Sequence, residues 1–231
     1  MNNKYLDKEL VEKLAKGGKD LAAKIGEDVF YGRIVNDIFC NLILQKIREY
    51  ELQENKLAHQ ANSMHNSSIL LADLGLKELV NEFFKKTLVK VIHSLLPECM
   101  NQEFDNLHGY VVRYGDMFDK NLAFHVDDSL ITINLCLNED FSGSELVFQG
   151  VRCPTHINTD SVDEEEIVIT HKKGFAVIHY GKNRHYVNPI ADGKRYGLII
   201  WCQNSTESSN WHNALRNHQC MDSCNHKKYL Q

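Results

Sequence analysis

The sequence lacks long apolar runs, which argues against a protein that spans a membrane with helices. No run of roughly 18 or more consecutive apolar residues occurs in the chain, so we expect no transmembrane helix and no membrane partner. The first residues lead into a charged segment and not into an apolar core, so we also expect no secretory signal peptide. Internal repeats and low-complexity linkers are missing too, and nothing of that kind marks a domain boundary.

Basic charge and paired cysteines are scarce as well. Lys and Arg number 26 against 31 Asp and Glu, which gives a net charge of −5. Proteins that bind nucleic acids usually carry a basic face, so we expect no nucleic-acid partner. The seven cysteines are odd in number and scattered, unlike a disulfide framework. The sequence therefore predicts free thiols in a reducing compartment, either the cytoplasm or the nucleus.

What the chain does contain is typical of a globular domain. Its 231 residues are 43% hydrophobic and 25% charged, which are ordinary values for soluble folds. This length is enough for one sizeable domain with a helical annex.

The first hundred residues favour helices. Apolar residues recur at helical spacing over residues 5–60, with Gly17-Gly18 as a break, and a clearer helix is predicted over residues 77–96, just before Pro97. We favour packing of the first stretch on the outer face of a sheet. The alternative is a helix that recruits substrate or forms a homodimer.

From Tyr110 the hydrophobic period changes to two, which indicates strands. Over residues 131–137 the odd positions are apolar and the even positions are small or polar, so one face packs on helices while Asn134 points inward. Further strands are predicted around residues 146–148, 175–180 and 196–202. The fold class is therefore α+β.

Three side chains in this region have the spacing of a metal site. His125 and Asp127 lie two residues apart, and His185 lies far downstream. Two histidines and one carboxylate form the facial triad that holds Fe(II) and leaves positions open for other ligands. A His-x-Asp pair alone is common by chance, so the surrounding sequence has to show whether this pair belongs to a metal site.

The surrounding residues resemble a known family. The pattern runs through Tyr114, His125, Asp127, Asn134, Gly143, His185, Arg195 and Trp201, and is preceded by Asn62-Ser63-Met64 and Ile69 to Leu76. It is similar to the 2-oxoglutarate- and Fe(II)-dependent dioxygenases of the prolyl-4-hydroxylase and lysyl-hydroxylase type. It also resembles the iron- and 2-oxoglutarate-dependent oxygenase domain-containing proteins.

This resemblance implies a double-stranded β-helix (jelly-roll) core over residues 101–207, buttressed by helices in residues 1–100 and followed by a tail over residues 208–231. It implies iron on His125, Asp127 and His185, with 2-oxoglutarate, O2 and supporting ascorbate. Arg195 would bind the distal carboxylate of 2-oxoglutarate, on a strand adjacent to that of His185. The family has two glycines where this chain has Gly143-Ser144.

Other residues of the pattern have less direct expected roles. Tyr114 and Asn134 would contact the cosubstrate, whereas His179 is expected to be structural and Thr132 and Trp201 to pack around the site. The resemblance implies hydroxylation of a C–H bond, with release of succinate and CO2.

The substrate stays open at this point. A protein or peptide side chain of the Lys or Pro type is the leading hypothesis for the substrate, and a small molecule or free amino acid is the alternative. A non-catalytic iron-binding module is a third hypothesis.

The roles of two segments are left open by the sequence. The acidic run from Asp160 to Glu166 is read as a solvated loop or as a lid for a basic substrate. The tail, with Cys220, Cys224 and neighbouring histidines, has an unconvincing spacing for zinc and is read as a terminal tail or helix cap.

Overall fold

The computed structural model describes residues 3–53, 61, 64–222 and 224–226, which form a mixed fold of helices and antiparallel sheets. In these residues the larger sheet has the strand order β1-β2-β10-β6-β13-β4-β3, and the smaller sheet has the order β5-β11-β8-β9. A short pair, β12-β7, lies beside them. The strands are β1 (Ala23–Gly26), β2 (Val29–Arg33), β3 (Ile69–Leu70), β4 (Asn106–Tyr114), β5 (Leu122–His125), β6 (Ile131–Cys136), β7 (Phe141–Gly143), β8 (Leu146–Val151), β9 (Glu166–Ile169), β10 (Phe175–Tyr180), β11 (Asn183–Val187), β12 (Ile190–Gly193) and β13 (Arg195–Gln203).

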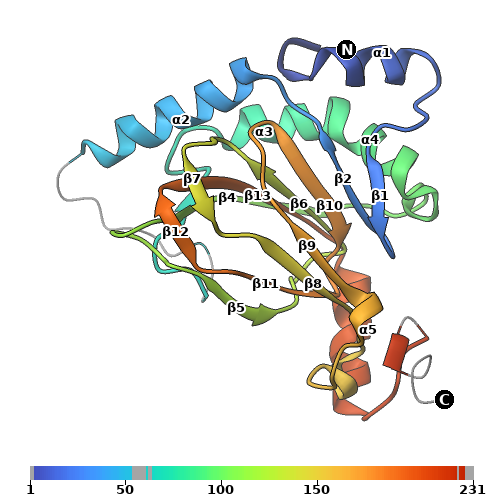
Figure 1. Ribbon diagram of the computed structural model, residues 1–231. Helices are drawn as coiled ribbons and strands as arrows, with labels where there is room; N and C mark the ends of the chain where they lie inside the picture. The colour runs from blue at the N-terminus through green and yellow to red at the C-terminus, as the bar shows by residue number, and fades with distance from the viewer. Residues whose placement is uncertain (1–2, 54–60, 62–63, 223, 227–231) are drawn as a thin grey trace.

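Helices cover one face of the larger sheet, and the smaller sheet lies over the other face (Figure 1). The helices on that face are α1 (Lys8–Ala15), α2 (Asp37–Glu51), α3 (Lys77–Phe83) and α4 (Val89–Leu95). Helix α5 (Ser205–Arg216) follows β13 and lies at the end of the sheets, against η4. Short helical turns are η1 (Asn3–Tyr5), η2 (Phe84–Leu88), η3 (Pro97–Cys99), η4 (Pro154–His156) and η5 (Asp163–Glu165). None of the helices in the described residues has the length and apolar character of a membrane span.

The two faces of the larger sheet belong to two separate hydrophobic clusters. On β13, Leu198 and Ile200 pack with the helices, whereas Ile199 between them packs toward the smaller sheet. Strand β6 behaves as predicted, because Ile131, Ile133 and Leu135 all join the helix-side cluster. Successive side chains of a strand point to opposite faces, so Asn134 is directed to the space between the sheets, where it is buried.

The helix predicted over residues 77–96 is confirmed. It runs through α3, one π-helical turn at η2 and α4, and it ends before Pro97. Proline lacks a backbone N–H and cannot continue the helix, which explains the position of this end.

The helix predicted over residues 5–60 is wrong for residues 23–33. This segment is the hairpin β1–β2, and β2 extends the larger sheet by pairing with β10. Asp28 makes the turn with a left-handed backbone (φ 56°), and Val29 and Phe30 are buried. Pairing with the sheet outweighs the weak helical spacing of Leu21 and Ile25, because the strand gains both hydrogen bonds and buried apolar area. Residues 54–60 lie outside the described residues.

The C-terminal segment is more ordered than a tail. Helix α5 starts at Ser205, where the Asn204 side chain accepts from the Glu207 backbone N–H, and it runs to Arg216. After it the chain returns to η4, the turn that follows β8. The region expected to be a tail from residue 208 therefore begins inside a helix, and its described residues Cys224 and His226 lie against His156 of η4.

Candidate metal centre

The smaller sheet brings together the three residues with metal-site spacing. His125 is the last residue of β5, and it is directly opposite His185 of β11 in the antiparallel pair. Opposed residues share one face of a sheet, so the two imidazole rings lie 4.1 Å apart between centroids. Asp127 follows two residues after His125, and its Oδ1 lies 3.4 Å from His125 Nε2 and 3.8 Å from His185 Nε2.

These three ligand atoms lie within 4.8 Å of one another, as expected for side chains that share one cation. Imidazole nitrogens and a carboxylate oxygen make up the donor set of the Fe(II) facial triad, which leaves other coordination positions open. The residues present therefore fit an iron ion.

Backbone carbonyls fix the orientation of both imidazoles. His125 Nδ1 lies 2.8 Å from the Ala123 carbonyl oxygen, and His185 Nδ1 lies 2.8 Å from the Asn183 carbonyl oxygen. A carbonyl oxygen only accepts, so each Nδ1 is the protonated nitrogen, and in the neutral imidazole Nε2 carries the lone pair that can bind a metal.

Thr132 on β6 orients the carboxylate. Its hydroxyl donates to Asp127 Oδ2 at 2.6 Å, which leaves Oδ1 facing the histidines. The turn that carries Asp127 is held by the Asp127 backbone N–H, which donates to the Gly181 carbonyl oxygen. A Cβ on Gly181 would lie 2.2 Å from the Ser129 carbonyl oxygen, so only glycine allows this close approach. Thr132, expected only to pack, is thus a hydrogen-bonding partner of the site.

Burial and mutual charge shape the protonation states at this centre. Burial lowers the pKa of His185 to about 3, and the charge of His125 acts in the same direction. Burial by itself would raise the pKa of Asp127, but the charges of His185 and His125 and the His125 hydrogen bond hold it well below its usual value. The site therefore presents an ionised carboxylate and a neutral imidazole, the forms that bind a cation.

His179 lies next to this centre without joining it. Its ring is 5.1 Å from that of His185, but its Nε2 is 4.0 Å from Asp127 Oδ2 and its Nδ1 bonds to the Tyr180 carbonyl oxygen. Its side chain is outside the group of three potential ligands. This placement agrees with the structural role expected for it.

Arg195 is completely buried at the start of β13. Its Nη1 donates to the Ser144 carbonyl oxygen at 3.2 Å and to Ser144 Oγ at 3.0 Å. Among the described residues its Nε and Nη2 have no hydrogen-bond partner. Its guanidinium carbon lies 5.1 Å from the centre of the Tyr114 ring, because Tyr114 is its cross-strand neighbour on β4.

The predicted strand arrangement around Arg195 is wrong in one respect. His185 and Arg195 lie in different sheets, on β11 and β13, and β12 runs between them in the chain. Sequence spacing indicates that two strands follow each other, but it does not show which strands pair. Both side chains are nevertheless buried.

Tyr114 and Asn134 are buried in the same part of the fold. Burial raises the pKa of Tyr114, the Arg195 charge lowers it and the Asp127 charge raises it, so the phenol is within electrostatic reach of both groups. Asn134 Oδ1 is buried without a hydrogen-bond partner in the described part of the chain.

Two buried histidines near the site were missed by the sequence analysis. His65 packs against the rings of Tyr110 and Tyr114 and lies 3.6 Å from Asp119 Oδ2, and burial lowers its pKa to about 4. Burial lowers the pKa of His171 as well, and the charge of Arg195 lowers it further. Neither belongs to a motif, and no pattern in the sequence singles them out from the other histidines.

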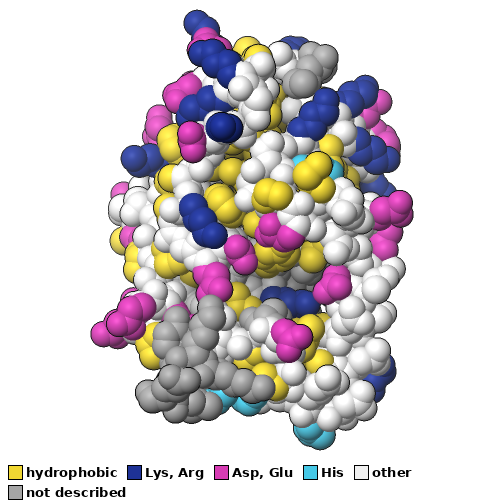
Figure 2. All heavy atoms as spheres, turned by 90° about the vertical axis from the view of Figure 1, so that its right-hand side faces the viewer, with side chains coloured by type: hydrophobic (Ala, Val, Ile, Leu, Met, Phe, Trp, Pro, Cys, Tyr) yellow, Lys and Arg dark blue, Asp and Glu magenta, His cyan; other side chains and the backbone are white. Residues whose placement is uncertain are grey.

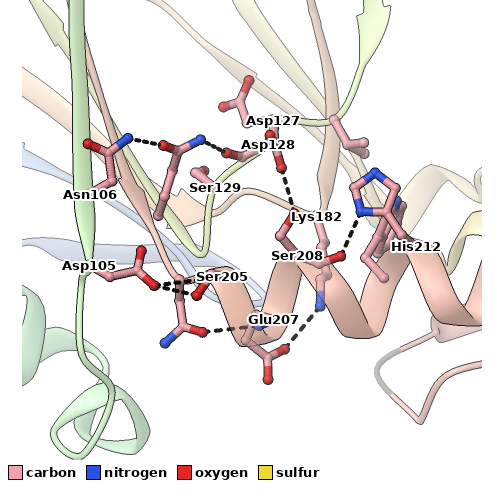
Figure 3. Close-up of a pocket in the computed structure, with 14 residues that line it drawn as sticks. Asp105, Asn106, Asp127, Asp128, Ser129, Lys182, Ser205, Glu207, Ser208 and His212 are labelled. Carbon is pink, nitrogen blue, oxygen red and sulfur yellow. Dashed lines mark hydrogen bonds and ion pairs between the residues drawn. The ribbon is translucent and has the colours of Figure 1, made fainter.

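An open cavity reaches Asp127 from the side of α5 (Figure 3). Its volume is about 540 Å³, and its lining is rich in acids, with Asp105, Asp128 and Glu207 against Lys182. A second cavity of about 430 Å³ shares Lys182 and Glu207 with the first. Its acidic side chains are Glu27, Asp28, Glu98, Glu207 and Asp222. The face of the molecule in Figure 2 is hollowed, with Asp and Glu side chains around the hollow.

Comparison with known proteins adds relatives of known class. No protein-family model matches the chain. It is 36% identical over 171 residues to the 2-oxoglutarate and iron-dependent oxygenase domain-containing protein ICU11 of Arabidopsis thaliana, covering 73% of this chain and 43% of that protein. It is 30% identical over 201 residues to protein CP2 of the same description and organism, covering 86% of this chain and 51% of that protein. The chain thus spans about half the length of these relatives.

A lysyl hydroxylase is a more distant relative, and a solved prolyl hydroxylase structure has a similar fold. The mouse procollagen-lysine,2-oxoglutarate 5-dioxygenase 2 is 23% identical over 180 residues, which is 73% of this chain and 22% of that protein. Among solved structures, a prolyl 4-hydroxylase of Phytophthora capsici superposes with a TM-score of 0.52 at 17% identity, covering 92% of this chain and 72% of that one. These findings confirm the resemblance stated from the sequence, and the superposition supports the fold.

Proposed function

We propose that this chain, a relative of the 2-oxoglutarate and iron-dependent oxygenase domain-containing proteins, is an Fe(II)- and 2-oxoglutarate-dependent hydroxylase. His125, Asp127 and His185 would hold the iron, because their ligand atoms converge and their imidazoles are oriented by the backbone. Bound iron would supply the oxidative chemistry, in which O2 and 2-oxoglutarate give succinate, CO2 and a hydroxylated C–H bond. Ascorbate would support turnover.

The observation that carries this proposal is the incomplete hydrogen bonding of Arg195. A buried cation without an anion is unfavourable, and two of its nitrogens have no partner in the described residues. A carboxylate offers two oxygens in the plane of a guanidinium and satisfies both nitrogens. We therefore assign Arg195 to the distal carboxylate of 2-oxoglutarate.

Tyr114 and Asn134 complete the proposed cosubstrate pocket. The Tyr114 ring covers one side of the Arg195 guanidinium and limits the directions from which a carboxylate approaches. The Asn134 side chain offers a buried polar group beside the same space between the sheets. The roles of Tyr114 and Asn134 both depend on the assignment of Arg195 to 2-oxoglutarate.

A lysine-containing peptide is the substrate class that the acidic cavities favour. Asp105, Asp128 and Glu207 line the cavity that reaches Asp127, with one lysine among them. Complementary charge steers a basic segment toward such a surface and disfavours an acidic one. A proline side chain or a neutral metabolite gains nothing from this lining.

We propose that the facing sheets form a double-stranded β-helix core over residues 101–207, with the helical part before it and residues 208–231 after it. Strands β1, β2 and β3 of the first hundred residues extend the larger sheet of this core. A homodimer and a cytoplasmic or nuclear location stay predictions from the sequence.

Turnover of 2-oxoglutarate tests the proposal. Purified protein with Fe(II), ascorbate and 2-oxoglutarate should release succinate, and a panel of peptides and free amino acids should reveal one substrate class by a gain of one oxygen in mass spectrometry. Lysine-containing peptides with basic neighbours should be modified, and matched peptides with acidic neighbours should not. Modification of free amino acids alone would favour the small-molecule reading.

Two variants provide the controls for this test. His185→Ala should lose both tight iron binding and succinate release, since one of three ligands is gone. His218→Asn, which removes an exposed imidazole outside the centre, should behave like the parent. Turnover that survives in His185→Ala would overturn the assignment of the metal ligands. Iron binding without any succinate release from the parent would favour a non-catalytic iron-binding module.

A further inference from the structure

A second cluster of metal-binding side chains lies away from the candidate iron centre. Cys153 and His156 come from the turn after β8, and Cys220 and Cys224 come from the segment after α5. The four potential ligand atoms lie within 4.8 Å of one another. The sequence indicates only Cys220 and Cys224 as candidates, because Cys153 and His156 lie far upstream and only the fold brings the two pairs together.

We propose that these four residues bind a structural zinc ion that fastens the C-terminal segment to the turn after β8. A Cys3His set is an established donor set for tetrahedral zinc. Thiolates also favour zinc over the hard cations that bind carboxylate sites. Four protein ligands fill a tetrahedral coordination shell, so the ion would have no open position for chemistry.

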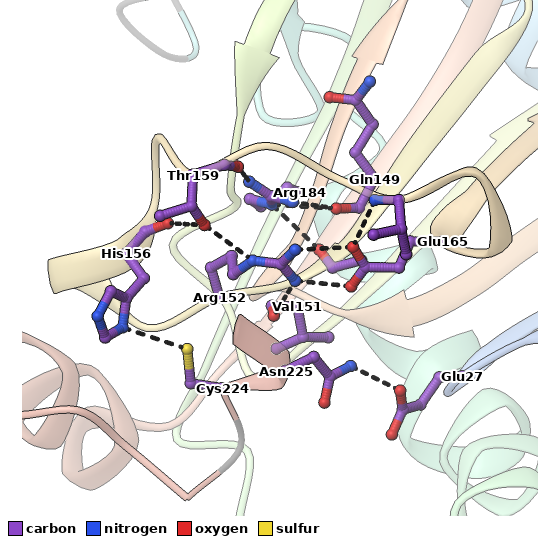
Figure 4. A network of polar contacts seen from close by, with 12 residues as sticks. Glu27, Gln149, Val151, Arg152, His156, Thr159, Glu165, Arg184, Cys224 and Asn225 are labelled. Carbon is purple, nitrogen blue, oxygen red and sulfur yellow. Dashed lines mark hydrogen bonds and ion pairs between the residues drawn. The ribbon is translucent and has the colours of Figure 1, made fainter. Parts of the chain in front are cut away.

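The distances in the cluster fit such an ion. With Zn–S near 2.3 Å and Zn–N near 2.0 Å, tetrahedral geometry requires about 3.5 Å between a ligand sulfur and a ligand nitrogen. Cys153 Sγ lies 3.2 Å from His156 Nδ1, and Cys224 Sγ lies 3.6 Å from the same nitrogen (Figure 4 draws the second contact). One imidazole nitrogen thus faces two thiols from opposite parts of the chain.

The burial of these side chains and their free thiols indicate a shared metal ion and not a group of unrelated cysteines. Cys153 and Cys224 are buried, and all four cysteine and histidine side chains meet at one point, where a disulfide would use only two of them. None of the seven cysteines is in a disulfide. The His226 ring stacks on the His156 ring at 4.3 Å between centroids, which limits rotation of the proposed ligand.

The rest of the segment is arranged so that zinc would hold it in place. Asn225, next to Cys224, donates to Glu27 Oε2 in the β1–β2 turn at 2.6 Å. On the other side, Arg184 donates to the carbonyl oxygens of Ile157 and Thr159, and it is the residue before His185. The proposed zinc site is thus connected to the strand that carries an iron ligand, while its own ligands are separate from that centre.

Metal analysis of the full chain tests this inference. Protein purified with reduced thiols should contain one zinc per chain, measured by elemental mass spectrometry and independent of iron. Co(II) in place of zinc should give the visible bands of a tetrahedral site and thiolate charge-transfer absorption. A centre with two imidazole nitrogens and one carboxylate oxygen has no thiolate and does not give this absorption. An organomercurial titrant should release the zinc as the thiols react.

Matched variants separate this site from the iron centre. Cys224→Ser should lose the zinc and retain iron, His185→Ala should do the opposite, and Cys40→Ala, at a buried cysteine outside the cluster, should retain both. If Cys224→Ser does not fold, the organomercurial release and the Co(II) spectrum of the parent still show whether the four side chains bind zinc. Reduced parent protein that takes up no zinc after reconstitution, or a disulfide between two of these cysteines in freshly isolated protein, would overturn the proposal.

Discussion

Arg195 and Arg152 are both completely buried, yet they differ in what surrounds the charge. All five N–H groups of Arg152 have acceptors: both carboxylate oxygens of Glu165, the carbonyls of Val151 and Asp160, and the Thr159 hydroxyl (Figure 4). Arg195 has acceptors for Nη1 alone among the described residues. The comparison teaches that burial does not distinguish a structural arginine from a ligand-binding one, whereas hydrogen-bond completeness does.

The backbone near Arg152 is adapted to its ion pair with Glu165. A Cβ on Gly150 would lie 2.2 Å from Glu165 Oε1, and Gly150 has a left-handed backbone (φ 70°), so glycine allows the ion pair to close. The acidic run that we read as a solvated loop is thus misread at Glu165, which is buried against Arg152, whereas Asp163 and Glu164 are exposed. No comparable acid pairs with Arg195 among the residues described.

The largest expected effect on stability comes from Arg152. Arg152→Met leaves the Glu165 carboxylate buried without its cation, and breaking one side of a buried pair costs about 3–5 kcal/mol. We expect the free energy of unfolding, measured by denaturant titration, to fall by that amount. Arg195→Met should change it by less than about 1 kcal/mol, because that arginine has few interactions to lose.

A double variant checks the cause of this loss. Arg152→Met combined with Glu165→Leu removes both charges, and an apolar replacement of a buried pair is often neutral, so most of the stability should return. A double variant as unstable as Arg152→Met would show that the loss comes from packing and not from the unpaired carboxylate. The contrast between the two arginines would then be unsupported.

The largest expected effect on binding comes from Arg195. Arg195→Ala should cost roughly 2–5 kcal/mol of 2-oxoglutarate binding, the range for truncating one side of a buried charge pair. At 1.4 kcal/mol per decade, the cosubstrate requirement should rise about 30-fold or more. Titration of succinate release against 2-oxoglutarate measures it, and iron content should stay that of the parent. Unchanged cosubstrate binding would mean that the unpartnered nitrogens of Arg195 serve another purpose.

The sequence predicts some of these features well and others not at all. His125 and Asp127 are two residues apart in the chain, so the cluster with His185 follows from spacing and family pattern. The Arg152–Glu165 pair and the meeting of His156 with Cys224 depend on how loops close, and neither has a periodic signal. The β1–β2 hairpin was missed because strands of four and five residues leave too little alternation to outweigh helical spacing.

A lysine at position 195 distinguishes charge from geometry. Arg195→Lys keeps a cation in the pocket but loses the planar pair of donors, so it should bind 2-oxoglutarate more weakly than the parent and more tightly than Arg195→Ala. We expect a rise in the cosubstrate requirement of roughly tenfold, which corresponds to 1.4 kcal/mol. A lysine variant that equals Arg195→Ala would indicate that two-point hydrogen bonding, and not charge, accounts for the whole effect.

The smallest expected effect is at Ser144, the residue that anchors Arg195. Its hydroxyl and its carbonyl both accept from Arg195 Nη1, and its backbone is left-handed (φ 60°), a conformation that glycine adopts at lower cost. Ser144→Gly loses one hydrogen bond of about 0.5–1.5 kcal/mol and keeps the carbonyl acceptor. The 2-oxoglutarate requirement should rise by about two- to tenfold. The free energy of unfolding should stay within about 1 kcal/mol of the parent.

Ser144→Ala is the matched control, because it removes the same hydroxyl and retains the backbone strain. Both variants should show the same change in cosubstrate binding, measured by the same succinate titration, and only Ser144→Ala should unfold more easily, since it gains nothing from the left-handed backbone. If neither variant changes cosubstrate binding, the hydroxyl does not orient Arg195. The guanidinium would then be held by the Ser144 carbonyl and the Tyr114 ring, and its Nε and Nη2 would still be left for a carboxylate to satisfy.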